Sequence, residues 1–275
     1  MSDSHPANPS AYLAALEEHL APSRGRALWA RHWWAHTDIE HFQPFIHLLS
    51  HHTNVKGARV LDTGCGVAGF LLALHKSGAA DLVGIELDPE KARLARLRVE
   101  GKPIRIVEQD AATLGDPIKF DIVTGLHVVE HVADPDAYVQ ALRRLLSPDG
   151  VLLLACPNRL WWREGHSRLP LVHWLGPRSR RRVATTLSTS QLVPLSIRQR
   201  AEVALQYETD FTAISLRRLL QRHGLRIIEL NPWGAWGGPP VIIAGSHLLT
   251  RWAPPVHRFV RSVVGDQLIV IARVR

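Results

Sequence analysis

Three glycines and one carboxylate lie close together in the segment Arg59–Phe70, and their types and spacing suit a ligand-binding turn. Gly64, Gly66 and Gly69 carry no side-chain bulk, so the backbone there can approach a ligand closely. The helix expected after them presents unpaired N–H groups and the positive end of its dipole. The G-x-G-x-x-G spacing is also the dinucleotide fingerprint. Asp62 argues against a dinucleotide, because a carboxylate two residues before Gly64 would repel a pyrophosphate but could accept hydrogen bonds from an ammonium group or a water.

Two further acids follow predicted strands. Glu86 closes the predicted strand 81–86, within reach of a ribose bound on the glycine turn, and Asp110 follows the predicted strand 104–107. Ligands of open parallel sheets bind at the carboxyl ends of the strands. Each acid alone would more often be a helix cap or a solvated loop charge, but three at consecutive strand ends predict one shared site.

The histidines offer a second kind of chemistry. His127, Glu130 and His131 form an H-x-x-E-H pattern. If this segment is helical, the three side chains share one face and could hold a metal ion. The alternative, which we adopt, is that they line the cofactor and substrate pocket without a metal.

The glycine turn with its preceding acid resembles motif I of the class I S-adenosylmethionine-dependent methyltransferases. Glu130-His-Val-Ala-Asp-Pro135 is similar to a motif of the branch that includes ubiquinone-pathway O-methyltransferases, some of which carry an acid where this chain has His127. The resemblance covers residues 57–158 well, and it departs at Ala68, where the family usually has a glycine. It implies S-adenosylmethionine as cofactor and a Rossmann-like α/β fold whose seven-stranded sheet is mostly parallel with an antiparallel last strand. The cofactor contacts implied are Asp62, Gly64, Cys65, Gly66, Glu86, Leu87, Asp110, Ala111 and Leu126.

The segment from Cys156 to Pro177 is similar to a stretch in methyltransferases of surface-glycan and glycolipid assembly. We therefore expect O-methylation of a glycan, glycolipid or other lipid-linked acceptor. The alternatives are a small-molecule methyltransferase for a quinone or natural product, and a non-catalytic S-adenosylmethionine-binding protein. Nucleic acid is not expected, because Gly-Leu-His127 follows the fourth strand instead of an Asn-Pro-Pro-Tyr type of motif.

A hydroxyl acceptor must lose its proton, and histidine suits that task near neutral pH. His166, His131 and His127, in that order, are our candidates for the general base, with His173 behind them.

Composition narrows the setting. The 275 residues carry a formal net charge of +8, and 46% of them are hydrophobic. Two cysteines make no disulfide framework, and the polar start lacks the regions of a secretory signal, so we expect a cytoplasmic protein. Arginine, tryptophan and leucine are interleaved in residues 159–182 and recur in residues 233–261, a composition typical of interfacial segments. A peripheral position on the anionic inner face of a membrane is one expectation, and an ordinary substrate lid is the other.

Alternating apolar strands and periodic helices must position these residues. We expect strands at 58–62, 81–86, 104–107, 120–124, 151–155, 225–230 and 267–274, and helices at 11–20, 28–36, 67–76, 89–98, 135–146 and 214–223. Residues 1–56 are expected to form a helical cap or lid, and residues 57–275 the cofactor-binding domain. Irregular insertions are expected at about 157–207 and 231–266, where long connections suggest function.

Overall fold

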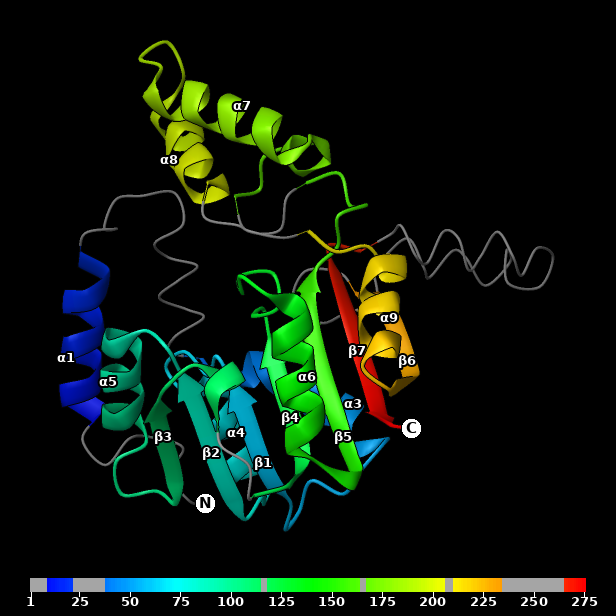
Figure 1. The fold of residues 1–275 in the computed structure, drawn as a ribbon. Helices are drawn as coiled ribbons and strands as arrows, with labels where there is room; N and C mark the ends of the chain where they lie inside the picture. The colour runs from blue at the N-terminus through cyan, green and yellow to red at the C-terminus, as the bar shows by residue number, and fades with distance from the viewer. Residues whose placement is uncertain (1–8, 22–37, 115–117, 164–166, 206–209, 234–264) are drawn as a thin grey trace, which may run out of the picture.

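In the computed structural model, seven strands form a single sheet in the order β3-β2-β1-β4-β5-β7-β6 (Figure 1). The structure describes residues 9–21, 38–114, 118–163, 167–205, 210–233 and 265–275. The strands are β1 (Arg59–Thr63), β2 (Asp81–Glu86), β3 (Ile104–Glu108), β4 (Phe120–Leu126), β5 (Leu146–Pro157), β6 (Leu225–Trp233) and β7 (Gln267–Val274). β7 runs antiparallel to β5 and β6, and the pairs among β1 to β5 are parallel. The expected sheet and its antiparallel last strand are confirmed.

Helices cover both faces of this sheet, as the alternating sequence pattern predicts. They are α1 (Pro9–Leu20), η2 (Glu40–Phe42), α3 (Gln43–Ser50), α4 (Gly69–Lys76), α5 (Pro89–Arg98), η3 (Ala111–Thr113), α6 (Pro135–Leu145), η4 (Val172–Trp174), α7 (Pro177–Thr189), α8 (Leu195–Ala204) and α9 (Ala213–Arg222). Buried residues of α3, α4 and α5 form one apolar cluster with the sheet. Those of α6 and α9 form another on the opposite face.

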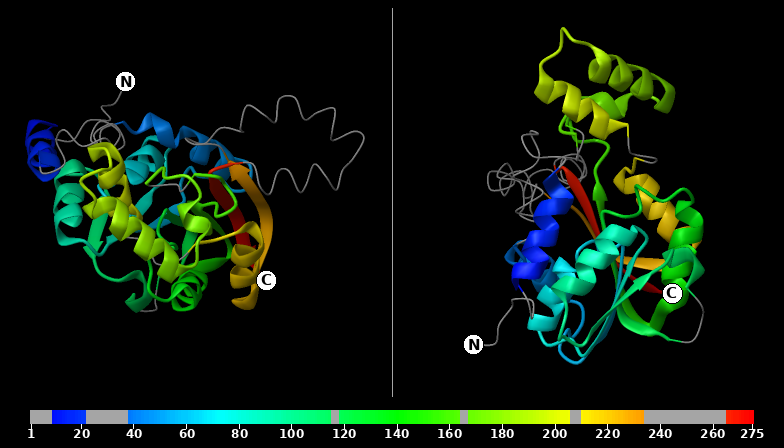
Figure 2. Two further views of the ribbon diagram at one scale, coloured as in Figure 1. Left: turned by 90° about the horizontal axis from the view of Figure 1, so that it is seen from above. Right: turned by 90° about the vertical axis from the view of Figure 1, so that its left-hand side faces the viewer.

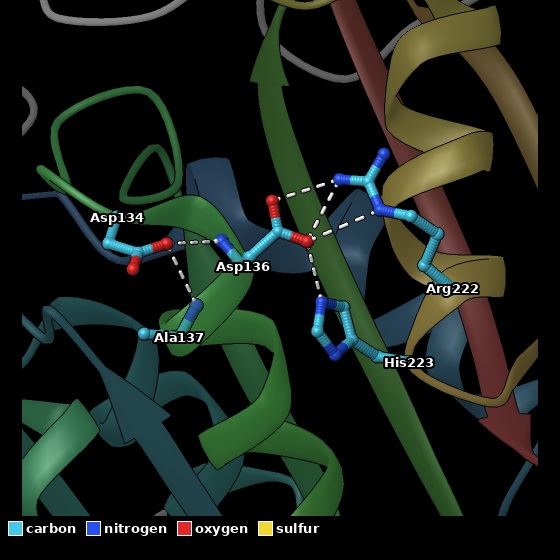
Figure 3. A network of polar contacts seen from close by, with 5 residues as sticks. All are labelled: Asp134, Asp136, Ala137, Arg222 and His223. Carbon is cyan, nitrogen blue, oxygen red and sulfur yellow. Dashed lines mark hydrogen bonds and ion pairs between the residues drawn. The ribbon is translucent and has the colours of Figure 1, made fainter.

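The start of α6 is fixed by short-range polar contacts (Figure 3). Asp134 Oδ1 accepts hydrogen bonds from the backbone N–H groups of Asp136 and Ala137, at 2.9 and 3.0 Å, which is the N-cap expected for an Asp-Pro pair. Asp136 in turn accepts hydrogen bonds from His223 and Arg222 at the end of α9, each at 2.8 Å. These two donors, His223 first, lower the pKa of Asp136. The contacts join the start of α6 to the end of α9.

Two features near the site bear on the sequence analysis. Residues 127–131 form a turn, so the helix that metal binding by the H-x-x-E-H pattern would need is not there. β5 begins at Leu146, five residues before the expected start at 151, because Leu146 already pairs with Phe120. The extra residues are taken up as an irregularity in the β4–β5 register.

The first insertion is not irregular as expected. It contains the two helices α7 and α8, which stand as a pair above the carboxyl edge of the sheet (Figures 1 and 2). A small cluster of its own, in which Ala184, Ala201 and Ala204 are buried with Leu169 and Val172, holds this pair together. Most of the second insertion, from residue 234 to 264, and the expected helix 28–36 lie outside the described residues.

The N-terminal helix α1 packs beside α5 (Figure 1). Tyr12, Leu16 and Leu20 of α1 are buried against Leu94 of α5 and Val67 of the glycine turn. α1 therefore supports the turn from the side. The assignment of residues 1–56 as a lid over the pocket stays a prediction.

Candidate functional site at the carboxyl edge of the sheet

The glycine turn between β1 and α4 has the conformation that its composition predicts. Gly64 and Gly66 have φ of +65° and +54°, a region in which glycine is unstrained. A Cβ at Gly64 would collide with the side chain of Val128, whereas one at Gly66 would meet nothing within 4 Å. The turn is therefore packed against the end of β4 on one side and open on the other. Ala68 also has a positive φ, +61°, so the chain keeps there the conformation of the glycine that the resemblance leads one to expect.

Residues of three other elements hold this turn in place. The N–H of Cys65 donates to the Ile85 carbonyl of β2 at 2.9 Å. The Cys65 sulfur lies against Gly84, so its side chain points into the sheet and only its backbone is available to a ligand. Arg98 of α5 is buried, and its guanidinium lies 5.1 Å from the centre of the Tyr12 ring and donates to the Val67 carbonyl at 3.2 Å.

Asp62 at the end of β1 is a buried carboxylate with an unusual proton affinity. Its side chain is 3% exposed, and Oδ1 accepts a hydrogen bond from Thr124 Oγ1 of β4 at 2.6 Å. Burial raises the pKa of Asp62 to about 7, the Thr124 hydrogen bond lowers it, and the Glu86 carboxylate raises it. A cationic group bound nearby would restore the ionised form, because an opposite charge favours it.

Glu86 at the end of β2 connects the turn to the next loop. Its Oε2 accepts the Gly66 N–H at 2.8 Å, and its Oε1 accepts the Asp88 N–H at 3.0 Å. Each carboxylate oxygen keeps a further lone pair. Glu86 is therefore fixed in position and can still accept hydrogen bonds from a vicinal diol such as that of a ribose.

The third acid and an apolar side chain continue this row. Asp110 follows β3, is exposed, and caps the short helix η3 by accepting the Ala112 N–H at 2.8 Å. Ala111 beside it is buried. The backbone N–H of Gln109 donates to the Glu86 carbonyl at 3.2 Å, so the ends of β2 and β3 are tied together. Leu87 is 67% exposed between them and presents a free apolar surface to a flat ring.

The strand order brings the predicted cofactor residues together. Because β3, β2, β1 and β4 are neighbours, Asp110, Glu86, Asp62 and Leu126 follow one another along a single edge. The set offers a buried carboxylate for an amine, a fixed carboxylate for a diol, and an apolar surface with an acid beside it for an aromatic ring bearing an amino group. That donor set fits an amino acid joined to a nucleoside.

His127 is the histidine that the structure places beside this row. It follows Leu126 directly, has φ of +58°, and donates its backbone N–H to the Ala155 carbonyl of β5 at 2.8 Å. Positive φ is uncommon for a residue other than glycine, and such conformations concentrate at functional sites. Val128, the next residue, contacts Gly64 of the glycine turn. His127 therefore lies next to the residue that packs against the glycine turn.

A carboxylate accompanies His127. His127 Nδ1 lies 3.3 Å from Glu130 Oε1, and the Glu130 side chain is buried while that of His127 is about one-third exposed. If Nδ1 donates its proton to Glu130, Nε2 is the ring nitrogen that carries the acceptor lone pair. The exposed part of the ring can then accept a proton from a bound molecule.

Residues from the far end of the chain complete this corner. Asp266, just before β7, is buried. Its Oδ2 accepts a hydrogen bond from Nη1 of Arg168 in the first insertion at 3.1 Å. Burial raises the pKa of Asp266, while Arg168 and, more weakly, His127 lower it. Asn158 ties the end of β5 to this segment by donating its backbone N–H to the Asp266 carbonyl at 2.9 Å and its side-chain amide to the Gly265 carbonyl at 3.0 Å.

The other predicted histidines are placed differently. His131 lies on the exposed side of the turn. His173 is buried and its Nε2 lies 2.6 Å from the Trp161 carbonyl, a contact that orders the insertion. His166, our first candidate, lies outside the described residues. Among the residues that the structure describes, no three His, Cys, Asp or Glu side chains converge to hold a metal ion.

Sequence reasoning missed several residues of this site. Thr124, Asp266 and Arg98 carry no motif, and each reaches the site through a contact with a residue more than 30 positions away. Asp266 has one local signal, since it is an acid directly before the last predicted strand.

A cavity of about 510 Å³ lies elsewhere, between the start of α6 and the helix α9. Its lining includes Asp136, Phe211, Thr212, Arg218 and Arg222 and none of the predicted site residues. It therefore does not bear on the site at the carboxyl edge.

Comparisons with known proteins identify the family and the fold. A family model described as a methyltransferase domain matches residues 33–230. A ubiquinone biosynthesis O-methyltransferase of Cereibacter sphaeroides is 39% identical over 109 residues, which cover 38% of this chain and 43% of that protein. One of Xanthomonas oryzae pv. oryzae is 33% identical over 172 residues, covering 58% of this chain and 66% of that protein. The chain thus spans between about two fifths and two thirds of the length of these relatives.

Solved structures share the fold at low sequence identity. An S-adenosylmethionine-dependent methyltransferase from Mesorhizobium loti superposes with a TM-score of 0.58 at 17% identity, over 86% of this chain and 100% of that one. A magnesium protoporphyrin IX methyltransferase from Synechocystis PCC 6803, solved with bound S-adenosylhomocysteine, gives a TM-score of 0.57 at 16% identity, over 98% of this chain and 96% of that one.

Proposed function

The chain belongs to the methyltransferase domain family and has the fold of the class I S-adenosylmethionine-dependent methyltransferases, and we propose that it methylates a hydroxyl group of an acceptor that carries an apolar or lipid portion. S-adenosylmethionine is the cofactor of this class. The observation that carries the proposal is the juxtaposition of the row Asp62, Glu86 and Asp110 with the His127–Glu130 pair at the same edge.

The residues present fit this cofactor. Asp62 would accept hydrogen bonds from the ammonium group of the cofactor, directly or through a water, and Glu86 would accept them from the ribose hydroxyls. Asp110 would accept a hydrogen bond from the adenine amine, with Leu87 against the adenine ring. The open side of the turn at Gly66 leaves room for the ligand. When bound, the cofactor supplies a methyl group on a sulfonium centre, which is open to in-line displacement.

His127 is the general base in this proposal. His127 Nε2 would accept the proton that the acceptor O–H loses as its oxygen takes the methyl group. Glu130 holds the imidazole in the tautomer whose Nε2 is unprotonated and stabilises the imidazolium that forms. General base catalysis of this kind contributes about 10²- to 10⁴-fold in rate.

Two acceptor classes remain, and each has its own support. The similarity of Cys156–Pro177 to glycolipid-assembly enzymes favours a lipid-linked glycan. The names of the curated relatives favour a quinone-type small molecule. Both place a hydroxyl next to an apolar group, which agrees with the exposed Trp162 and Trp174 of the insertion above the edge.

Two measurements test the proposal. Calorimetry with S-adenosylhomocysteine and with NAD compares the ligands, and tighter binding of NAD would overturn the cofactor assignment. Isotope-labelled S-adenosylmethionine is then incubated with a polyprenyl quinol, with a glycolipid extract and with RNA. Label in the quinol or the glycolipid decides between the two acceptor classes, and label in the RNA alone would refute both.

A further inference from the structure

The connection between α7 and α8 exposes apolar side chains at the point farthest from the sheet. Leu192 is 97% exposed, Leu195 58% and Ile197 36%. In Figure 1 and in the right-hand view of Figure 2 this connection is the highest part of the molecule, above both helices. Single exposed apolar residues are ordinary, but three within six positions at a protruding tip form a local patch.

These residues are not needed to hold the two helices together. The contact between α7 and α8 is made by the buried alanines Ala184, Ala201 and Ala204 with Leu187 packed against them. Nothing in that arrangement requires Leu192 or Leu195. Their exposure is therefore a property of the surface rather than a consequence of the packing.

The same two helices carry a strong positive charge. Arg178, Arg181 and Arg182 of α7 are exposed and lie three and four positions apart, so they share one side of the helix. α8 adds two half-buried arginines, at positions 198 and 200, and one exposed acid, Glu202. Arg180 does not belong to this set, since it is buried and paired with Asp210.

The apolar tip after the end of α7 and the arginines in the first half of that helix together fit one kind of partner. Leucine and isoleucine enter the boundary between headgroups and acyl chains, and guanidinium groups meet lipid phosphates. Nucleic acid would attract the arginines but gives no role to Leu192 and Leu195. No helix among the described residues is long and apolar enough to cross a bilayer.

We propose that the tip formed by residues 190–197, together with Arg178, Arg181 and Arg182 on the first half of α7, docks the protein onto an anionic lipid surface. The inference deepens the proposed function, on which it rests for its purpose, since docking would bring the carboxyl edge of the sheet toward acceptors held in the membrane. The sequence alone suggests a membrane contact in residues 159–182 and 233–261. The proposal adds the connection between α7 and α8, where apolar side chains are exposed.

Vesicle flotation of the full-length protein tests this surface. Wild-type protein should float with phosphatidylglycerol-containing vesicles, bind weakly to pure phosphatidylcholine, and be released by high salt. The double variant Leu192→Ser and Leu195→Ser should lower the partition coefficient at least ~10-fold, because two exposed apolar anchors are lost. Replacing Arg178, Arg181 and Arg182 with glutamate should lower it ~10²-fold or more at low salt.

Matched controls distinguish a role of this surface from the effect of losing any exposed leucine or of an equal change in net charge elsewhere. Leu13→Ser removes an exposed leucine of α1, and the triple change Arg105→Glu, Arg217→Glu and Arg218→Glu alters the net charge equally on other exposed elements. Both controls should bind vesicles nearly as well as wild type. Equal loss in the tip variants and the controls, equal binding to neutral vesicles, or oligomers that disappear in the tip variant would each overturn the proposal.

Calorimetry with S-adenosylhomocysteine on the same variants keeps this result separate from the proposed function. The tip variants should bind S-adenosylhomocysteine as the wild type does, whether or not they bind lipid. A protein that docks on vesicles but binds no S-adenosylhomocysteine would contradict the enzyme assignment and leave the docking surface standing.

Discussion

Thr124 Oγ1 donates a 2.6 Å hydrogen bond to Asp62 Oδ1, and through it the ends of β4 and β1 hold a carboxylate that burial keeps partly protonated near neutral pH. Burial alone disfavours the ionised form of Asp62. A cationic ligand bound nearby would favour the ionised form. The arrangement therefore predicts that cofactor binding and proton release are linked.

Relative to wild type, Asp62→Asn should gain stability as the pH rises from 4 to 7, whereas its affinity for the cofactor should be lower. The pKa of Asp62 is raised in the fold to about 7, above its unfolded value, so the native state binds more protons between about pH 4 and 7. Wild-type stability from this group therefore falls as pH rises through that window, and the loss persists above pH 7. Each pKa unit corresponds to about 1.4 kcal/mol. The free energy of unfolding of Asp62→Asn relative to wild type should rise from pH 4 to 7 and then level off, as denaturant titrations would measure.

The same group sets the pH dependence of binding. Wild-type affinity for S-adenosylhomocysteine should fall by up to ~10-fold per pH unit below about 7, because the carboxylate must first ionise. Asp62→Asn should bind more weakly at pH 8 and show a flatter profile. Calorimetry at pH 5.5 to 8.5 measures both, and an identical profile for the two proteins would remove Asp62 from the site.

Gly64 and Gly66 form a matched pair. Both have positive φ, but only a Cβ at Gly64 collides with Val128. Gly64→Val should abolish S-adenosylhomocysteine binding, because the added side chain collides with Val128 and a β-branched residue cannot adopt the backbone conformation of the turn. Gly64→Ala should lower the thermal stability more than Gly66→Ala does, and Val128→Ala should recover part of the difference. Equal effects of the two alanine variants on Tm would show that the contact with Val128 is unimportant.

The His127–Glu130 pair predicts a division between kcat and cofactor affinity. His127→Ala should lower kcat ~10²- to 10⁴-fold with unchanged S-adenosylhomocysteine affinity. Glu130→Gln keeps the size of the side chain but weakens the control of the tautomer, so its loss in kcat should be smaller and its KM nearly unchanged. A full-rate His127→Ala variant would exclude His127 as the general base and leave His166 as the next candidate.

Arg168 and Asp266 join the first insertion to the start of β7, with their charged atoms 3.1 Å apart. Arg168→Met should leave the buried Asp266 carboxylate without its cationic partner, and removing one member of a buried pair costs about 3–5 kcal/mol. Since the Arg168 side chain is about one-quarter exposed, we expect the low end of that range or less. The double variant Arg168→Met with Asp266→Asn should recover part of the loss, as chemical denaturation would show. Additive losses would mean that the two residues do not interact.

The cofactor edge could be predicted from the sequence because its signals are local. An apolar strand, a glycine turn and a helix follow one another within the 18 residues Arg59–Lys76. The acids at positions 86 and 110 lie at strand ends that neighbouring parallel strands must bring together. Helix starts at Asp88 and Asp134 were equally local, since an Asp-Pro pair specifies a cap by itself.

Only the tertiary structure brought together the residues around His127, because their contacts join distant parts of the chain. The periodic placement of His127, Glu130 and His131 suggested a helix, yet β4 continues to Leu126 and the next residues must turn back toward α6, which leaves His127 facing Glu130. Asp266 reaches Arg168 and Asn158 only because β7 inserts between β5 and β6. The role of each arginine in α7 was also undecided by composition. Packing buries Arg180 against Asp210 and leaves its neighbours Arg181 and Arg182 in solvent, since a helix turns by about 100° from one residue to the next.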